Sequence, residues 1–493
     1  MRGRAFSSHT VTMIIQSQSP LRPFAPARPS ARAAVPAESQ PGDSVQISRD
    51  TPLSRRSASS LKGGQQQLAF KAAEQGAPLF GVGGLIFPDS TGKIKEMALQ
   101  LGNVEFDKPL PEETHNGLLG VWNQLFTHMP ETHFTVVCAD QRGIDDVNKL
   151  VQDSGTDPQR VSVVPAQADK MSIWIRDSML PVRAEDGHTK LLIQDRTYWP
   201  GEGDNTIAPT LAQVHGQDQH NPITSQQHPA LRIDGGNILS NSKQIIVGSD
   251  SIRHTRARLQ ELAQDPARAK EIEEFYTRAS GQPADDKDKM WEELPKLVFQ
   301  SEFGRPVLVI ARDHDQPAFH IDMCATPIGD SKFLVGDPSL AIKTLKALTP
   351  EERAATNREM ALNAGINSGE DLIGKLMAAE DNAENQANYD AVAAELKEAG
   401  YEIERVPAMM GLRTTWSVPY LTYNNCIMER YPAADGSETK KVYLPQYGCQ
   451  VLDKMAEKIY QGNDYEVIPL QMGSISKLEG AIRCSSYAIE REF

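Results

Sequence analysis

One pattern recurs four times between residues 170 and 450 of this 493-residue chain. Each copy is expected to open with a polar motif on a strand, followed by a turn rich in Gly, Asp, Asn or Ser and a second apolar strand. The copies span residues 174–194, 233–248, 319–336 and 420–445. A unit this small cannot enclose a core alone, so the copies are expected to pack radially about an axis, where their polar motifs would meet.

The rest of the chain predicts an α/β class, because helical and strand patterns alternate before and between the copies. The early elements are helices expected over Glu112–His128 and Ile144–Gln152, and strands over Leu79–Pro88 and Phe134–Ala139. Helices are also expected after three of the copies, over Arg253–Leu262, Leu340–Ala347 and Val451–Tyr460. Longer helical stretches near 265–300 and 345–400 are interpreted as insertions.

The N-terminal part of the chain differs in composition from the remainder. Residues 1–65 are rich in Ser, Pro, Arg, Ala and Gln and carry a net charge of +6, whereas the remainder carries −20. Such a segment cannot bury enough apolar surface to fold. We therefore expect a disordered basic tail or leader over 1–67 and a catalytic domain over 68–493. A cytoplasmic location is expected, unless the tail is a targeting or secretion leader.

Charge, hydropathy and cysteine content limit the possible partners and the cellular compartment. The acidic body suits a cationic small molecule or basic peptide and argues against nucleic acid. No apolar run approaches 18 residues, so no membrane span is expected. The five cysteines form no C-x-x-C pair, which argues against a disulfide framework or zinc ribbon and favours a reducing compartment. Nothing in the sequence sets an oligomeric state.

Four polar motifs and one cysteine are the candidates for chemistry. They are Trp174–Asp177, Asp234–Asn237, His320–Asp322, Asn425, and Cys484 within Gly480–Tyr487. Each is ambiguous alone. A single cysteine is more often a small buried hydrophobe than a nucleophile, and an acid before Gly-Gly-Asn often only forms a turn. His320 and Asp322 are expected to face the same side of one strand, because they are two residues apart.

Together these side chains suit an attack on a guanidinium group. Two carboxylates can hold a planar guanidinium by charged hydrogen bonds, while a thiolate attacks its central carbon. A bound cation lowers the pKa of a neighbouring thiol. A histidine can protonate the leaving amine and then activate water, and a further carboxylate can orient the imidazole.

The motifs resemble those of the guanidine-modifying enzymes known as penteins, which share a five-bladed α/β propeller. The group includes agmatine, arginine and peptidylarginine deiminases and amidinotransferases. The matching segments are a W-x-R-D motif at 174–177, G-G-N at 235–237, H-I-D at 320–322, Y-x-N at 423–425, a V-x-x-P-Q-Y-G segment at 442–448 and the cysteine turn at 480–484. The resemblance covers about residues 75–493, apart from the two insertions.

The resemblance implies roles for individual residues. Cys484 would be the nucleophile, His320 the general acid and base, and Asp177 and Asp322 the guanidinium clamp. The substrate-binding residues would be Trp174, Asp234, Asn237 and Asn425, with Asp234 where some relatives place an acid that supports the histidine. The resemblance implies neither a cofactor nor a metal.

The implied reaction converts a guanidinium to a ureido group, with peptidyl-arginine as the first candidate substrate because of the H-I-D and G-G-N motifs. Two departures put the substrate in question: Arg483 replaces the usual histidine before the cysteine, and 198–205 lacks arginines for a substrate carboxylate. Agmatine, free arginine and amidino transfer remain alternatives. Two rival classes are a metal-dependent hydrolase built on His320, Asp322 and Cys324, and a binding module without catalysis.

Overall fold

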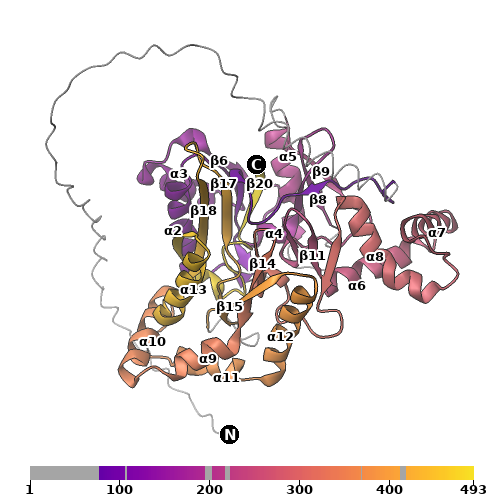
Figure 1. Cartoon of the computed structure of the whole chain (residues 1–493). Helices are drawn as coiled ribbons and strands as arrows, with labels where there is room; N and C mark the ends of the chain where they lie inside the picture. The colour runs from indigo at the N-terminus through magenta and orange to yellow at the C-terminus, as the bar shows by residue number, and fades with distance from the viewer. Residues whose placement is uncertain (1–76, 106–107, 195–201, 217–221, 368, 411–417) are drawn as a thin grey trace, which may run out of the picture. The chain divides into compact units, whose positions relative to one another are not determined.

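The computed structural model describes residues 77–493, except 106–107, 195–201, 217–221, 368 and 411–417 (Figure 1). The tail predicted over 1–67 lies outside the described residues. The α/β class is confirmed by helices and strands that alternate along the described chain.

Five sheets in the described part of the chain share one motif: an antiparallel strand pair followed by a parallel third strand. Four of them contain the repeats predicted from the sequence. Their strands are β1 (Leu85–Ile86), β7 (Leu180–Arg183), β8 (Thr189–Ile193) and β9 (Thr224–Gln227); β10 (Ile238–Ser240), β11 (Ile245–Gly248) and β12 (Val307–Ile310); β13 (Ala325–Ile328), β14 (Lys332–Asp337), β15 (Glu402–Met409) and β16 (Leu421–Thr422); and β17 (Ile427–Pro432), β18 (Glu438–Gln446) and β19 (Glu466–Gln471).

The fifth sheet joins the two ends of the described chain. Its strands are β20 (Ser486–Glu492), β2 (Lys93–Leu101), β5 (His133–Cys138) and β6 (Val161–Pro165), in that order. β20 pairs antiparallel with β2, with Ala98 opposite Tyr487, and β2 pairs parallel with β5. The pairing fixes the segment just before β20, which contains Cys484 (Figure 1).

The helices follow the apolar periodicity of the sequence. In α2 (Glu112–His128) the buried residues Leu118, Val121, Trp122 and Leu125 recur every three or four positions, which places one face on the core. The other helices that follow strands are α3 (Gln141–Ser154), α6 (Ser249–Leu262), α9 (Pro338–Lys346) and α13 (Gln450–Gly462). The stretches interpreted as insertions contain α7 (Pro266–Ser280) and α8 (Lys287–Phe303), and α10 (Pro350–Ala364), α11 (Leu372–Glu380) and α12 (Ala383–Glu398).

The polar motifs do not lie on strands, contrary to the prediction for His320 and Asp322. Asp177 lies in the short helix α4 (Ile175–Ser178), and Asp322 lies in the 3-10 turn η4 (Ile321–Met323). The Gly-Gly-Asn segment forms a second 3-10 turn, η3 (Gly235–Asn237), as expected of a turn signature. Each motif therefore precedes the first strand of its hairpin, and a turn rather than strand alternation sets the direction of its side chains.

The strand predicted over Leu79–Pro88 is also wrong for most of its length, because only Leu85–Ile86 pairs in a sheet. The Glu302 carboxylate accepts hydrogen bonds from four consecutive backbone N–H groups, those of residues 80–83. These donors are therefore unavailable to a sheet. None of the described helices combines the length and apolar character that crossing a bilayer requires.

Candidate functional site

Cys484 is held by the side chain of Asn425, which lies in the loop between β16 and β17. Asn425 Oδ1 accepts hydrogen bonds from the backbone N–H groups of Arg483 and Cys484, at 3.0 and 3.2 Å. Its Nδ2 donates to Cys484 Sγ at 3.1 Å. The Cys484 carbonyl accepts from the N–H of Arg176, in α4, at 3.1 Å. One asparagine therefore fixes both the backbone and the thiol of the cysteine turn.

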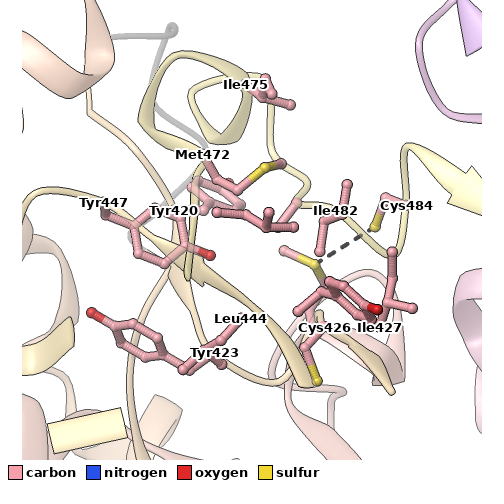
Figure 2. Packing of buried hydrophobic residues seen from close by; sticks show 14 of the residues in the cluster. Tyr420, Tyr423, Cys426, Ile427, Leu444, Tyr447, Met472, Ile475, Ile482 and Cys484 are labelled. Atoms are coloured by element: carbon pink, nitrogen blue, oxygen red, sulfur yellow. Dashed lines mark hydrogen bonds between the residues drawn. The ribbon is translucent and has the colours of Figure 1, made fainter. Parts of the chain in front are cut away.

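The thiol lies at a boundary between the apolar core and the acids of the site. Its Sγ is 4.0 Å from Met323 Sδ, the contact drawn as a dashed line in Figure 2, and 4.0 Å from Asp322 Oδ2. Ile482, two residues before Cys484, belongs to the same buried apolar cluster and is drawn beside it in Figure 2. Burial, and then the charges of Asp322 and Asp177, raise the pKa of the Cys484 thiol well above its usual value. Without a bound cation the thiol is therefore protonated at neutral pH.

His320 lies beside Asp177, with 3.6 Å between Nδ1 and Oδ1. Both side chains are nearly buried, with 12% and 11% exposed. The imidazole also packs closely against Gly236 in η3, where a Cβ atom would overlap the ring. The second glycine of the Gly-Gly-Asn turn is thus required because a side chain there would overlap the His320 ring, and not because its backbone is left-handed.

Asp322 is fully buried and its two oxygens have different surroundings. Oδ2 accepts a hydrogen bond from Arg483 Nη1 at 2.6 Å, whereas Oδ1 has no hydrogen-bond partner among the described residues. Arg483 Nη2 bonds Asp89 Oδ1, also at 2.6 Å. Burial lowers the pKa of Arg483, but Asp89 and Asp322 outweigh it and raise that pKa. Arg483 is therefore a fixed cation that leaves one Asp322 oxygen open.

The outer end of this ion-pair chain borders a small pocket. Asp89, Arg176, Arg483 and Arg491 line the pocket, and Cys484 does not. Arg176 stacks on the Tyr487 ring at 3.9 Å and donates from Nε to the Arg483 carbonyl at 2.7 Å. The arginine of the W-x-R-D motif thus supports the cysteine turn.

Trp174 contacts Glu105, a buried carboxylate that the sequence analysis missed. Its indole Nε1 donates to Glu105 Oε1 at 3.1 Å, and its ring packs so closely on Gly480 that a Cβ there would overlap it. Glu105 belongs to the short strand β3 (Val104–Glu105), paired with β4 (Lys108–Pro109). Burial raises the pKa of Glu105 to about 8, with a smaller contribution from nearby acids that include Asp177.

Asn237 and Asp234 are engaged with neighbouring protein groups. Asn237 Oδ1 accepts from the Ile321 N–H at 3.3 Å, and its Nδ2 donates to Ser251 Oγ at 3.1 Å, so it positions the turn that carries His320. Asp234 forms an ion pair with Arg232 at 3.4 Å and accepts a hydrogen bond from Gln194. These contacts are those of supporting residues.

The structure therefore brings Cys484, Asn425 and Asp322 together, and places His320 on Asp177. The sequence analysis missed Asp89, Glu105 and the role of Arg176. Only the unusual arginine before Cys484 signalled a further charge pair, because a buried arginine needs acidic partners. Within the described ranges no group of three His, Cys, Asp or Glu side chains is placed to hold a metal.

Comparison with known proteins gives a fold match. No protein-family model and no curated protein matches the sequence. A provisionally assigned agmatine deiminase of known structure is 13% identical, with a TM-score of 0.51, over 83% of this chain and 97% of its own. A provisionally assigned arginine deiminase from Porphyromonas gingivalis is 15% identical, with a TM-score of 0.50, over 82% and 97%. The chain therefore has the fold of the guanidine-modifying enzymes of the pentein superfamily.

Proposed function

We propose that the protein is a cysteine-dependent deiminase that hydrolyses a guanidinium group to a ureido group and ammonium. The observation that carries this proposal is the buried Cys484 thiol, 4.0 Å from an Asp322 carboxylate whose other oxygen has no partner in the described part of the chain. A cationic planar group suits that vacant acceptor. The five sheets of one motif are proposed to surround the site as a five-bladed ring.

In the first half of the reaction the substrate activates its own nucleophile. A guanidinium held by Asp322 and Asp177 offsets the charges that raise the Cys484 pKa, so the thiol gives up its proton and His320 takes it. The thiolate attacks the guanidinium carbon, and the C–N bond to one amino group breaks. His320 passes this proton to that nitrogen, which leaves as ammonia. The substrate carbon stays bonded to the Cys484 sulfur as a thiouronium.

In the second half water replaces the thiol. His320 accepts a proton from water, which attacks the thiouronium carbon, and the C–S bond breaks to release the ureido product. The net balance is one guanidinium and one water to one ureido group and one ammonium ion. Asp177, 3.6 Å from His320 Nδ1, stabilises the imidazolium formed in this step.

The sequence motifs favour peptidyl-arginine as the substrate, which would become peptidyl-citrulline, and agmatine is the second candidate. An amidinotransferase would follow the same first half but pass the amidino group to an amine. Free arginine is less favoured, because two arginines of the cysteine turn and its neighbouring helix, within the described residues, already have partners. Arg483 bonds Asp89 and Asp322, and Arg176 bonds the Arg483 carbonyl.

The test is to incubate the purified protein with an arginine peptide, agmatine and free arginine and to measure ureido product and ammonia. At least one guanidine should yield both in equal amounts, and Cys484→Ser should yield neither. Amidino product only in the presence of an added amine would identify a transferase. Binding of guanidines without any product would indicate a binding module without catalysis.

A further inference from the structure

Glu105 accepts fewer hydrogen bonds than two other buried carboxylates of this protein, Glu302 and Glu429. Glu302 receives four backbone N–H groups, and Glu429 receives the Ile94 N–H and the Tyr443 hydroxyl. Glu105 is 3% exposed and receives one donor, the Trp174 indole, at Oε1. Its Oε2 is buried without a hydrogen-bond partner among the described residues. A purely structural carboxylate would have both oxygens bonded.

The surroundings of Glu105 are acidic on the side of the candidate site. Asp177, Asp204 and Glu479 all lie within electrostatic range of its carboxyl. Lys108, opposite Glu105 in the β3–β4 hairpin, has an exposed side chain. Buried like charges disfavour one another, so these acids would favour a cation bound at Glu105.

Trp174 connects this region to the guanidinium clamp. Its indole contacts Glu105, its ring packs on Gly480 of the cysteine turn, and Asp177 follows it one helical turn later. We propose that Glu105 Oε2 binds a second positive charge of the substrate, an ammonium group at the end remote from the guanidinium. This inference rests on the proposed deiminase function. It places an aminoalkylguanidine such as agmatine ahead of peptidyl-arginine, the substrate that the sequence motifs favour.

The experiment compares agmatine with butylguanidine, which has the same guanidinium and chain length but no ammonium. In Glu105→Gln the KM for agmatine should rise about tenfold or more, because a charged hydrogen bond is lost, while butylguanidine kinetics stay unchanged. Gln retains the acceptor for Trp174. Glu96→Gln, which neutralises a carboxylate on β2 paired with His215, is the matched control and should alter neither substrate.

The pH dependence gives a readout that needs no substitution. Only ionised Glu105 attracts an ammonium group, so in the wild type the ratio of kcat/KM for agmatine to that for butylguanidine should increase as pH rises through about 8. The ratio should be flat in Glu105→Gln. A flat wild-type ratio, or a Glu105→Gln effect equal for both substrates, would overturn the inference.

Failure of the inference is distinguishable from failure of the proposed function. If the wild type turns over no guanidine, the deiminase proposal fails. The Glu105 site is then tested alone with 1,4-diaminobutane, which should raise the melting temperature of the wild type but not of Glu105→Gln. No shift in the wild type would reject the cation site as well.

Discussion

One oxygen of Asp322, Oδ2, lies next to both Arg483 and the Cys484 thiol. Arg483 binds Oδ2 at 2.6 Å, and the Cys484 sulfur lies 4.0 Å from the same atom. The ion pair with Arg483 supplies a buried counter-charge to Asp322 and fixes the plane of its carboxylate. Burial and the charge of Asp322 also raise the pKa of the Cys484 thiol.

Replacing Asp322 by asparagine should therefore separate thiol reactivity from catalysis. Loss of the negative charge lowers the Cys484 pKa, so alkylation by neutral iodoacetamide at pH 7 should become faster, about tenfold for each unit of pKa. The kcat/KM for a guanidine should fall about a hundredfold or more, because a charged hydrogen bond to the substrate is lost.

Asp330→Asn is the control for this pair of measurements, because Asp330 bonds the backbone of Ser242 in another hairpin turn. It should change neither rate. If Asp322→Asn slowed both alkylation and turnover, Asp322 would act through the stability of the turn rather than through its charge.

At the scale of elements, the insertion helix α8 binds the backbone of residues 80–83, near the start of the described chain. Its residue Glu302 accepts the N–H groups of residues 80–83 at 2.8–3.2 Å and lies 3.7 Å from His228. Burial raises the Glu302 pKa, but the nearby His228 imidazole and the hydrogen bonds from the backbone outweigh it and lower that pKa. The insertion near 265–300 therefore contributes to the fold as well as extending it.

Glu302→Gln should destabilise the protein by about 3 kcal/mol, because an amide NH₂ would face N–H donors that the carboxylate now satisfies. The folded-state pKa of Glu302 is below its unfolded value of about 4.3, so its contribution is present above that pH. The difference in unfolding free energy between the two proteins should thus be constant at neutral pH. It should shrink as pH falls through the folded-state pKa.

Urea unfolding monitored by circular dichroism at several pH values measures this difference. Glu293→Gln, on the same helix with one hydrogen bond to the Tyr276 hydroxyl, should cost much less. Equal effects of the two substitutions would show that the four N–H contacts add nothing.

Prediction from sequence succeeded where periodicity and turn residues decide the structure. The limits of α2 agree with the prediction, and the four hairpins agree with their predicted copies to within one residue at the C-terminal limit. It failed for Leu79–Pro88, because the donor groups of that segment bind Glu302, which is 219 residues or more away in sequence. The motifs identified Cys484, His320 and Asp322, but Glu105 and Asp89 lacked any local signature. Their roles arise from partners distant in the chain.

For the whole molecule, the pairing of β2 with β20 places the first long strand beside the last. None of the candidate site residues precedes Asp89, and the N–H groups bound by Glu302 begin at Phe80. We therefore expect a protein that begins at Leu68 to keep the melting temperature and the turnover number of the full chain. Only the affinity for a cationic substrate should change, and only at low salt, because a tail of charge +6 acts through screened electrostatics.

Thermal unfolding and steady-state kinetics at two salt concentrations check this expectation. A full-length variant in which the arginines of residues 1–65 are replaced by glutamine controls for charge alone. Insolubility of the shortened protein, or loss of activity at every salt concentration, would place the tail within the fold.

The central claim is that Cys484 attacks a cation held by the acids beside it. All five cysteines are buried, and burial raises the pKa of each, so thiol reactivity alone does not distinguish them. The most direct measurement is peptide mass spectrometry after treatment with 2-chloroacetamidine, a cationic amidine, and with neutral 2-chloroacetamide. The account predicts that the amidine modifies Cys484 alone, faster than the amide does, and that Asp322→Asn removes the difference. Modification of Cys324 instead, or equal rates for the two reagents at Cys484, would contradict it.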